Sequence, residues 1–275
     1  MAWLGGIFIG LLIGLSIAGI GGGLLVRRLN ATRERLRQAD RLAELGTLTA
    51  GLAHEIKNPL STVQLNLQLL QEDLASDGST TARVTNRLNT VTREAVRLRA
   101  ILDDFLRYAG RIELQPEWID LNDLLDDLVD FLAPQAALTK VQLRRMPSEG
   151  PLNACVDPKL IKQALLNLML NALQLMPGGG ELIVGARVHP DRQAGERAVL
   201  TVTDTGPGIS AEEQAKVFDA YFSKRRGGTG LGLAMTRRIA REHGGRVNLS
   251  SEVGKGSRFE IELPLHPNGP CEANG

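Results

Sequence analysis

The spacing of hydrophobic residues divides the chain into three kinds of sequence. Residues 2–26 carry no charged side chain, residues 45–105 repeat apolar positions at three- and four-residue steps, and residues 112–266 alternate short β-branched runs with helical patterns. Such steps put apolar side chains on one side of an α-helix, whereas a short β-branched run is typical of a strand. The pattern predicts an α+β protein with an N-terminal transmembrane helix, a helical hairpin and an α/β sandwich.

The uncharged segment is long enough to cross a bilayer. At a helical rise of about 1.5 Å per residue, residues 2–26 cover a hydrocarbon core of roughly 30 Å. A cleaved signal peptide is the alternative, but no basic stretch precedes the run, which is also too long for a signal. The arginines that follow are Arg27, Arg28, Arg33, Arg35, Arg37 and Arg41. By the positive-inside rule we expect a single-pass anchor (1–26) in the cell (inner) membrane, then a juxtamembrane signalling helix (27–44), with the C-terminal part in the cytoplasm.

Small residues recur every fourth position along the same segment. They are Gly6, Gly10, Gly14, Ala18 and Gly22. A smooth face of this kind lets two membrane helices approach closely, which would favour a dimer. Glycine is also frequent in membrane helices in general, and the two interpretations have equal weight.

The next region, residues 45–110, contains two apolar stripes. The first runs through Leu48, Leu52, Ile56, Leu60 and Val63, and the second through Val84, Leu88, Val91, Ala95, Leu98, Leu102 and Phe105. A turn at residues 76–79 separates them, so the region predicts a helical hairpin. One hairpin cannot bury both stripes, whereas two copies can pair into a four-helix bundle. We therefore expect a dimerisation domain and a homodimer.

Residues 111–266 are predicted to fold as one α/β sandwich with a mixed sheet, because strands and helices are interleaved. The expected strands are residues 140–143, 182–188, 199–203, 246–249 and 258–263, and the expected helices are 121–132, 159–175 and 231–243. The polar, Gly- and Pro-rich tail, residues 267–275, is expected to be disordered.

The charge balance indicates which partners are disfavoured, and the cysteine content indicates the redox compartment. With 32 Lys and Arg against 31 Asp and Glu, the net charge of +1 does not favour direct nucleic-acid binding. Cys155 and Cys271 lie far apart without metal-ligand spacing, so we expect no disulfide framework and a reducing compartment.

The first candidate for chemistry is His54 on the first hairpin helix. It lies two positions from Leu52, hence on the side away from the apolar stripe. A neutral imidazole is a nucleophile near pH 7, and the adjacent Glu55 can accept or orient its proton. A solvent-facing structural histidine is the alternative for this segment alone. Asn58 stands where a zinc protease would need a second histidine, which excludes that class.

Further candidates lie in the sandwich region. Asn167 and Asn171 are four apart on a predicted helix, where two amides could ligate a hard cation such as Mg²⁺ or be satisfied by backbone. Asp204 ends a predicted strand and could accept a hydrogen bond from an adenine amine, while Gly206 and Gly208 let the backbone approach the ring; an ordinary turn is the alternative. The other histidines, at positions 189, 243 and 266, are expected to be non-catalytic, with His243 favoured by a helix dipole.

A glycine-rich stretch precedes the last predicted helix. It contains Gly228, Thr229, Gly230, Leu231 and Gly232, and its backbone N–H groups could bind phosphate oxygens. Ahead of it, Phe218, Tyr221 and Phe222 could anchor a mobile lid that carries the cations Lys224, Arg225 and Arg226.

Five motifs in a fixed order give the chain a resemblance to bacterial two-component sensor histidine kinases. They are HEIKNPL at residues 54–60, NLMLNA at 167–172, DTGPG at 204–208, FDAYF at 218–222 and GTGLGL at 228–233. The resemblance covers roughly residues 40–265 and identifies the H, N, G1, F and G2 boxes, with a GHKL-type ATP-binding domain.

The resemblance implies a role for each motif residue. His54 would be the phospho-acceptor, Glu55 its acid/base partner, and Asn58 would help to position water for dephosphorylating a response regulator. In the ATP-binding domain Asn171 would ligate Mg²⁺, Asn167 would lie beside the phosphates, and Asp204 would bind adenine. The other residues expected to contact ATP are Gly206, Gly208, Lys224, Gly228, Thr229, Gly230, Leu231 and Gly232.

The resemblance therefore implies a membrane-bound homodimeric kinase that phosphorylates itself on histidine with ATP and passes the phosphoryl group to a response regulator. A nucleotide-binding scaffold without transfer and a phosphatase-dominant regulator are the alternatives. The sequence does not identify the stimulus, the regulator, any membrane partner, the kinase/phosphatase balance, or whether phosphorylation occurs within or between protomers.

Overall fold

The computed structural model describes residues 49, 51–74, 81–148, 150–191, 195–223, 228–265 and 271. The expected anchor (1–26) and signalling helix (27–44) lie outside these residues, as do the turn at 76–79, Lys224 and nearly all of the tail. Within the described ranges, no helix has the length and apolar character needed to cross a membrane. From Leu52 onward the described elements belong to one compact unit.

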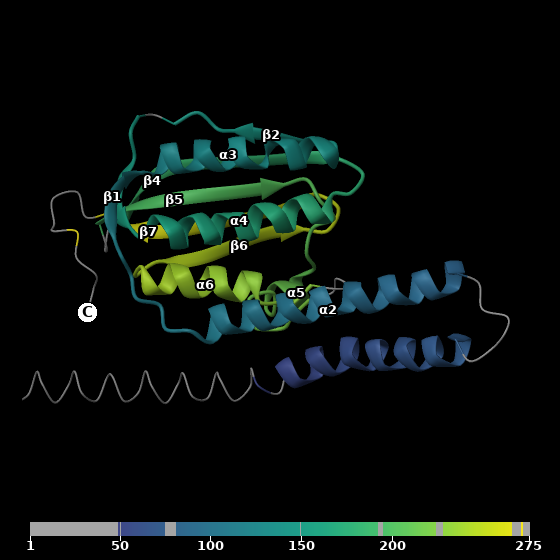
Figure 1. Cartoon of the computed structure of the whole chain (residues 1–275). Helices are drawn as coiled ribbons and strands as arrows, with labels where there is room; N and C mark the ends of the chain where they lie inside the picture. The colour runs from purple at the N-terminus through teal and green to yellow at the C-terminus, as the bar shows by residue number, and fades with distance from the viewer. Residues whose placement is uncertain are drawn as a thin grey trace, which may run out of the picture. The chain divides into compact units, whose positions relative to one another are not determined.

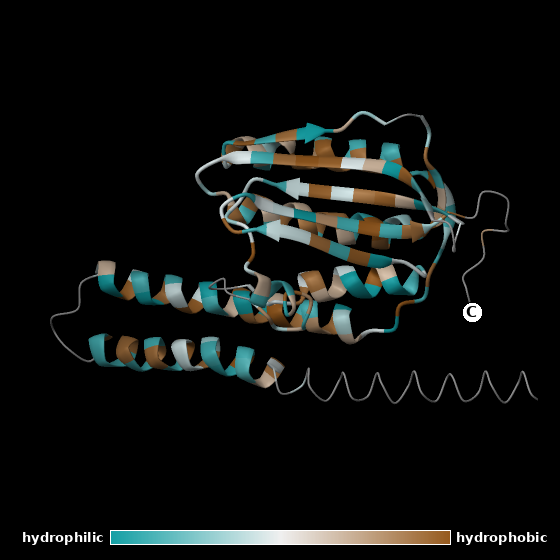
Figure 2. Cartoon of the chain, turned by 180° about the vertical axis from the view of Figure 1, so that it is seen from behind, coloured by the Kyte–Doolittle hydropathy of each residue, from teal (hydrophilic) through white to brown (hydrophobic). Residues whose placement is uncertain are grey.

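Two antiparallel helices form the predicted hairpin (Figure 1). The first spans residues 51–74 and the second, α2, spans Thr81–Ala109. Asp73 pairs with Arg87 at 2.6 Å near the turn, and Glu55 pairs with Arg97 at 3.7 Å further along. The two helices alone leave much of the apolar seam uncovered, and Figure 2 shows hydrophobic residues along both of them.

The remaining strands and helices build the predicted α/β fold around a mixed five-stranded sheet. Its order is β2-β4-β5-β7-β6, in which β2 pairs with β4 in parallel and the other neighbours are antiparallel. The strands are β2 (Val141–Arg145), β4 (Gly180–Asp191), β5 (Gly195–Asp204), β6 (Arg246–Glu252) and β7 (Gly256–Pro264). All five strands expected from the sequence are present, so the mixed sheet is confirmed.

Three helices cover one face of this sheet, as the opposite views in Figures 1 and 2 show. They are α3 (Leu121–Leu138), α4 (Pro158–Leu175) and α6 (Gly232–Glu242). The middle helix, α4, turns its apolar side to the core, where Ile161, Leu165 and Leu168 are at most 1% exposed. Burial of these side chains is the main favourable contribution to the stability of the sandwich.

A single carboxylate fixes the start of α4. Asp157 caps the helix by accepting hydrogen bonds from the backbone N–H groups of Lys159 and Leu160, each at 3.1 Å. It also accepts one from the N–H of Gln115 at 3.0 Å, in the segment that joins the hairpin to the sandwich. The capping residue therefore ties this connecting segment to the helix that carries both predicted amides.

Three short elements were not expected from the sequence. Strands β1 (Glu117–Asp120) and β3 (Asn153–Val156) form a separate antiparallel pair, and α5 (Ala211–Gln214) is a single turn. Each has four residues. Such lengths are too short to show a hydrophobic period.

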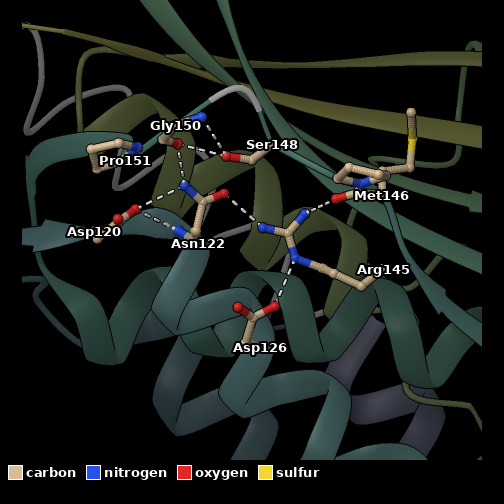
Figure 3. A pocket seen from close by; sticks show the side chains of 9 residues that line it. Asp120, Asn122, Asp126, Arg145, Met146, Ser148, Gly150 and Pro151 are labelled. Carbon is tan, nitrogen blue, oxygen red and sulfur yellow. Dashed lines mark hydrogen bonds and ion pairs between the residues drawn. The ribbon is translucent and has the colours of Figure 1, made fainter.

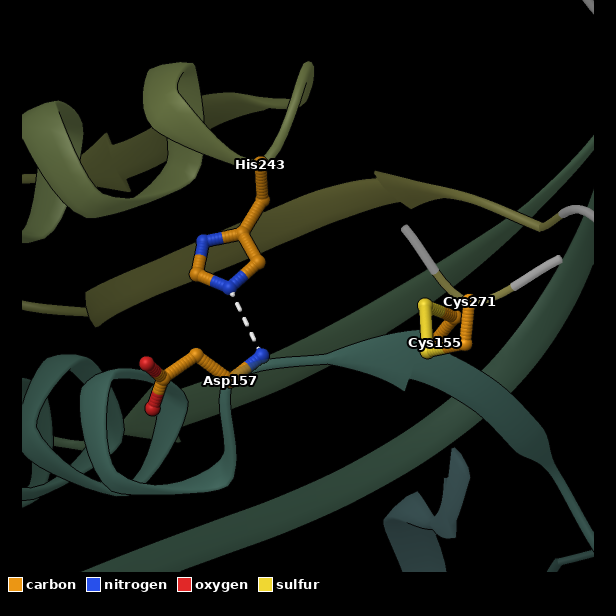
Figure 4. The surroundings of a disulfide bond; sticks show 4 residues. All are labelled: Cys155, Asp157, His243 and Cys271. Atoms are coloured by element: carbon orange, nitrogen blue, oxygen red, sulfur yellow. Dashed lines mark hydrogen bonds between the residues drawn. A yellow bond between two sulfur atoms is a disulfide. The ribbon is translucent and has the colours of Figure 1, made fainter. Parts of the chain in front are cut away.

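A disulfide joins Cys155 of β3 to Cys271, with Cα atoms 5.5 Å apart (Figure 4). The expectation of unpaired cysteines is therefore wrong in this structure. Their separation of 116 residues concealed the pairing, because the last part of the chain returns to the β1–β3 pair. Cys271 is the one described residue of the tail that was expected to be disordered, and this bond fixes its position.

His243 at the end of α6 is buried and neutral. Its Nε2 accepts a hydrogen bond from the N–H of Asp157 at 3.0 Å, while Nδ1 lies 2.8 Å from the carbonyl of Ile239 and donates to it. Burial lowers the pKa of this imidazole, against smaller opposing contributions led by the Ile239 hydrogen bond. The expected position of His243 at a helix C-terminus is confirmed. The expected benefit from the helix dipole is wrong for a neutral ring, because a nitrogen that accepts a hydrogen bond carries no proton.

Candidate functional site

His54 lies on the exposed side of the first hairpin helix, as its spacing from Leu52 predicted. The residue is exposed, and among the described residues its imidazole makes no hydrogen bond or ion pair. The neighbouring Glu55 is half-buried and pairs with Arg97 of α2, which also pairs with Glu94 at 3.7 Å. The hairpin thus holds the carboxylate while leaving the imidazole accessible.

Asn58 follows one turn later and is also exposed. The helix continues through Pro59, which is buried, and the hydroxyl of Thr62 donates to the carbonyl of Asn58 at 3.2 Å. The Asn58 side chain makes no hydrogen bond within the part of the chain that the structure describes. Its amide is therefore available beside Glu55.

The two amides of α4 differ in their contacts. Asn167 donates from Nδ2 to the carbonyl of Gly232 at 3.2 Å and is half-buried. Asn171, one turn further, is also half-buried and forms no hydrogen bond with the described residues. Its amide oxygen can therefore act as a ligand.

Asp204 at the end of β5 is the buried carboxylate of the predicted site. It is 4% exposed, and its Oδ1 accepts from the N–H of Gly206 at 2.8 Å. Burial raises the pKa of this carboxyl, while the backbone N–H groups of Gly206 and Ser257 act in the opposite direction. A carboxylate with few donors around it is suited to accept a hydrogen bond from a ligand amine.

Glycine is required on both sides of Pro207. A Cβ at Gly206 would lie 2.8 Å from Oδ1 of Asp204, and Gly208 has φ +71° with its Cβ position blocked by the carbonyl of Glu252. These residues shape the backbone that follows the carboxylate.

Helix α4 connects the predicted adenine end to the predicted phosphate end. Near its C-terminus the side chain of Met176 approaches Gly206, at 3.4 Å from where a Cβ would lie. Asn167, near the middle of α4, bonds to Gly232. Nine residues separate Asn167 from Met176, a helical rise of about 14 Å. The structure thus aligns the two glycine loops along one helix.

The glycine-rich loop leads directly into α6. Gly230 has φ +67°, Leu231 is 2% exposed, and the helix starts at Gly232 without a side-chain cap. Uncapped N–H groups at a helix start are suited to an anion. Thr229 uses its hydroxyl to donate to Asp104 of α2 at 2.8 Å.

The aromatic residues ahead of this loop are held in place. Phe218 packs edge-on against Phe259 with ring centroids 6.3 Å apart, and Arg237 lies 5.8 Å from the Phe218 centroid. Tyr221 has φ +64°, and its hydroxyl is buried without a hydrogen-bond partner. Burial, followed by the charges of Glu55 and Tyr108, raises the pKa of Tyr221 to about 12. The charge of Glu55, next to His54, thus contributes to the raised pKa of Tyr221, after burial.

Within the described ranges, no group of three or more His, Cys, Asp or Glu side chains could hold a metal ion. The Asn171 amide oxygen is nevertheless a suitable ligand for a hard cation such as Mg²⁺, which is usually bound with few protein ligands and with phosphate oxygens. The residues present therefore fit a cation that arrives with a nucleotide.

A separate hollow of about 420 Å³ lies between α3, β2 and the loop before β3 (Figure 3). Its polar groups are paired with one another: Arg145 bonds to Asp126 at 3.0 Å and to Asn122 at 2.7 Å, and Asn122 also donates to Gly150 at 3.0 Å. None of the predicted site residues lines it. The hollow is a surface depression whose polar side chains bond to one another, and it is not the candidate site.

Two family matches cover the hairpin and the sandwich. Residues 44–112 match the His Kinase A (phospho-acceptor) domain, and residues 156–267 match the histidine kinase-, DNA gyrase B- and HSP90-like ATPases. The chain belongs to the sensor histidine kinases. It is 31% identical over 241 residues to sensor histidine kinase ZraS of Escherichia coli O157:H7, a match that covers 88% of this chain and 51% of the relative.

Two further curated relatives are also histidine kinases. ZraS of Klebsiella oxytoca is 33% identical and AtoS of Escherichia coli K12 is 31% identical, with 87% and 86% of this chain covered against 51% and 38% of the relatives. The chain therefore spans about half the length, or less, of these curated relatives.

Two solved structures of histidine kinases are similar in fold. ThkA in complex with the response regulator TrrA matches with a TM-score of 0.66 and 26% identity, covering 83% of this chain and 64% of the ThkA chain. Full-length ShkA in complex with AMPPNP matches with a TM-score of 0.58 and 26% identity, covering 81% and 46%.

Sequence reasoning missed the residues on α2 that contact the motifs. Arg97 pairs with Glu55, and Asp104 bonds to Thr229. Both are charged positions off the apolar stripe, which on a lone helix indicate only a solvated face. Their partners lie elsewhere in the chain, and only the fold reveals them.

Proposed function

We propose that this protein is a membrane-anchored, homodimeric sensor histidine kinase that phosphorylates His54 with ATP and transfers the phosphoryl group to an aspartate of a response regulator. One observation carries the proposal: a solvent-facing imidazole and a buried carboxylate flanked by glycine loops occur in one compact unit. The ShkA structure with AMPPNP supports a nucleotide, and the ThkA–TrrA complex supports a regulator as partner.

His54 supplies the nucleophile. A ring nitrogen attacks the γ-phosphorus of ATP, a nitrogen–phosphorus bond forms, and the bond from that phosphorus to the bridging oxygen breaks to release ADP. Glu55, held by Arg97 at 3.7 Å, takes or orients the proton of the other ring nitrogen. The ion pair with Arg97 keeps this carboxylate on the residue next to the attacking histidine.

The sandwich domain binds the donor. Asp204 accepts a hydrogen bond from the adenine amine, and Gly206 and Gly208 let the backbone approach the base. Gly228, Thr229, Gly230, Leu231 and Gly232, together with Lys224, contact the phosphates, and Asn171 offers an oxygen to Mg²⁺. A cation held there would neutralise negative charge on the phosphates.

Asn167 suits transfer and not hydrolysis. Its side chain is an amide that donates to the Gly232 carbonyl, so it cannot take a proton from water. Because Asn167 does not act as a general base for water, the γ-phosphoryl group is kept for His54. This chemistry favours a kinase over a plain ATPase.

Dimer formation follows from the exposed hairpin seam. Leu60, Leu88 and Leu102 belong to the two predicted stripes and are 44%, 47% and 46% exposed in one chain. A second hairpin would cover them in a four-helix bundle. The anchor proposed for residues 1–26 would hold the pair at the membrane, with the kinase core in the cytoplasm.

A phosphatase activity toward the regulator is a second candidate. Asn58 is exposed one turn from His54, and its amide is available beside Glu55. An amide in this position can orient water toward a phosphorylated aspartate. Asn58→Ala should slow dephosphorylation of the phosphorylated regulator while His54 is still phosphorylated, whereas equal loss of both activities would contradict a separate role.

The main test uses the full chain in lipid nanodiscs with γ-labelled ATP and Mg²⁺. We expect acid-labile, base-stable label on His54, and a loss of at least about a thousandfold in His54→Gln, because no other nucleophile lies in that position. His189→Gln is the matched control, since His189 is an exposed histidine of β4. Label that persists in His54→Gln, or nucleotide binding without any phosphohistidine, would overturn the proposal in favour of another acceptor or a scaffold.

A further inference from the structure

The phosphate loop of the sandwich is bonded to the hairpin by an acidic side chain. The hydroxyl of Thr229 donates to Oδ2 of Asp104 at 2.8 Å, across 125 residues of sequence. Both residues are half-buried, and Asp104 has no other hydrogen-bond or ion-pair partner among the described residues. The Asp104 carboxylate therefore already accepts the hydrogen bond of the Thr229 hydroxyl, in the loop that is proposed to bind the phosphates of ATP.

A second contact holds the same helices together. Arg238 of α6 donates to the backbone carbonyls of Tyr108 and Gly110, the latter at 2.8 Å, and its guanidinium lies 5.6 Å from the centroid of the Tyr108 ring. Tyr108 is 8% exposed and Ile101 only 1%. The last turns of α2 are thus packed closely enough to fix where the Asp104 carboxylate lies.

The loop backbone is constrained on its other side. A Cβ at Gly230 would lie 2.5 Å from the carbonyl carbon of Tyr221, and both residues have positive φ. Positive φ is costly for a bulky residue such as tyrosine. The Tyr221 hydroxyl is also buried without a partner. The Thr229–Asp104 bond therefore holds the loop in an arrangement that includes strain and an unsatisfied hydroxyl.

We propose that Asp104 is an autoinhibitory anion: its carboxylate occupies Thr229 and must leave before the phosphates of ATP bind the glycine-rich loop. The inference rests on the proposed function and adds its regulation. Carboxylate and polyphosphate are both anionic, so they compete for the same donor and repel each other at short range. Docking of the loop on α2 and nucleotide binding are mutually exclusive, and any signal that moves α2 relative to α6 changes the affinity for ATP.

Removal of the carboxylate should strengthen nucleotide binding. Apparent affinity is reduced in proportion to the fraction of molecules that can bind. With about one molecule in ten undocked, Asp104→Ala should bind a fluorescent, non-hydrolysable ATP analogue with Mg²⁺ about tenfold more tightly than the full-length wild-type chain. Asp104→Asn, which keeps the shape and an acceptor but not the charge, should give an intermediate gain. Amide hydrogen exchange over residues 101–110 should become faster in Asp104→Ala.

Asp103→Ala is the matched control, because Asp103 is the exposed neighbour on the same helix. It should leave the affinity unchanged. In a Thr229→Val background, Asp104→Ala should give a smaller gain than in the wild-type background, since the bond is already absent and only the charge repulsion is relieved. Unchanged affinity in both Asp104 variants, or an equal gain in Asp103→Ala, would overturn the inference.

The binding measurement also separates this inference from the proposed function. Tighter binding in Asp104→Ala without phosphohistidine on His54 would support the inference and contradict the kinase. Phosphorylated His54 with equal affinities in all variants would support the kinase and contradict the inference. A chain that binds no analogue in any variant would overturn both.

Discussion

The hairpin and the sandwich bury their apolar residues to different degrees. α4 has 18 residues and buries Ile161, Ala164, Leu165, Leu168, Met169, Ala172 and Leu173. α2 has 29 residues and buries only Ile101 and Tyr108, both in its C-terminal part. The seam of the hairpin stays open within one chain, whereas the core of the sandwich is closed. The sandwich therefore closes its core within one chain, whereas the hairpin leaves its seam for the second copy that we propose.

Truncation of one leucine in each region gives the largest expected contrast. Leu165→Ala removes a fully buried side chain and should lower the free energy of unfolding of the sandwich by about 2–5 kcal/mol. Leu102→Ala, at a site 46% exposed in one chain, should change the stability of a dilute chain by no more than about 0.5 kcal/mol. Urea unfolding monitored by circular dichroism measures both values.

Protein concentration sharpens this contrast. The unfolding midpoint of Leu165→Ala should shift equally at every concentration, whereas Leu102→Ala should weaken the dimer in sedimentation experiments. If Leu102→Ala lowered the free energy of unfolding of the dilute monomer as much as Leu165→Ala does, the open hairpin seam would be contradicted.

Reduction of the Cys155–Cys271 bond should have the next largest effect, confined to the sandwich. Opening a loop of 116 residues raises the entropy of the unfolded chain, and natural disulfides typically contribute about 2–4 kcal/mol. Denaturation with and without dithiothreitol measures the difference, and Cys271→Ser is the control in which the reductant should have no effect. An equal loss of hairpin helicity on reduction would show that the two regions do not unfold separately.

The smallest effect is a pH dependence from His243. Burial lowers the pKa of this histidine below its ordinary 6.5, so the folded state binds its proton less tightly than the unfolded state does. Its stabilising contribution is complete above pH 6.5 and is lost as the pH falls below that value, by up to about 1.4 kcal/mol per pH unit.

Thermal unfolding between pH 7.5 and 5.5 tests this dependence. His243→Gln should reduce the slope, and His189→Gln, at an exposed site, should retain it. A slope that is the same in all three chains would place the titrating group elsewhere.

Long elements were predictable because a repeated period signals them. Both hairpin helices, the three sandwich helices and the five strands of the main sheet follow runs of apolar residues. β1 and β3 escaped prediction because four residues carry no clear period. The Cys155–Cys271 pairing was not predicted because the two cysteines are 116 residues apart and only the fold brings them together.

The candidate site was predictable as motifs but not as contacts. The amide of Asn167 and the carboxylate of Asp204 could be singled out because polar groups within apolar runs need a partner. The bond between Asp104 and Thr229 links two segments 125 residues apart, and an acidic residue on a helix surface gives no sign of its partner. Long-range pairing of this kind depends on how the elements pack.

Asp157 gives the connector between hairpin and sandwich a fixed pivot. The same carboxylate holds the Gln115 N–H and the first N–H groups of α4. If the connector swings, this side chain must either release it or shift the first turn of α4. A movement of the hairpin would then be transmitted along α4 to Asn167 and Asn171, although no described hydrogen bond joins either residue to the connector.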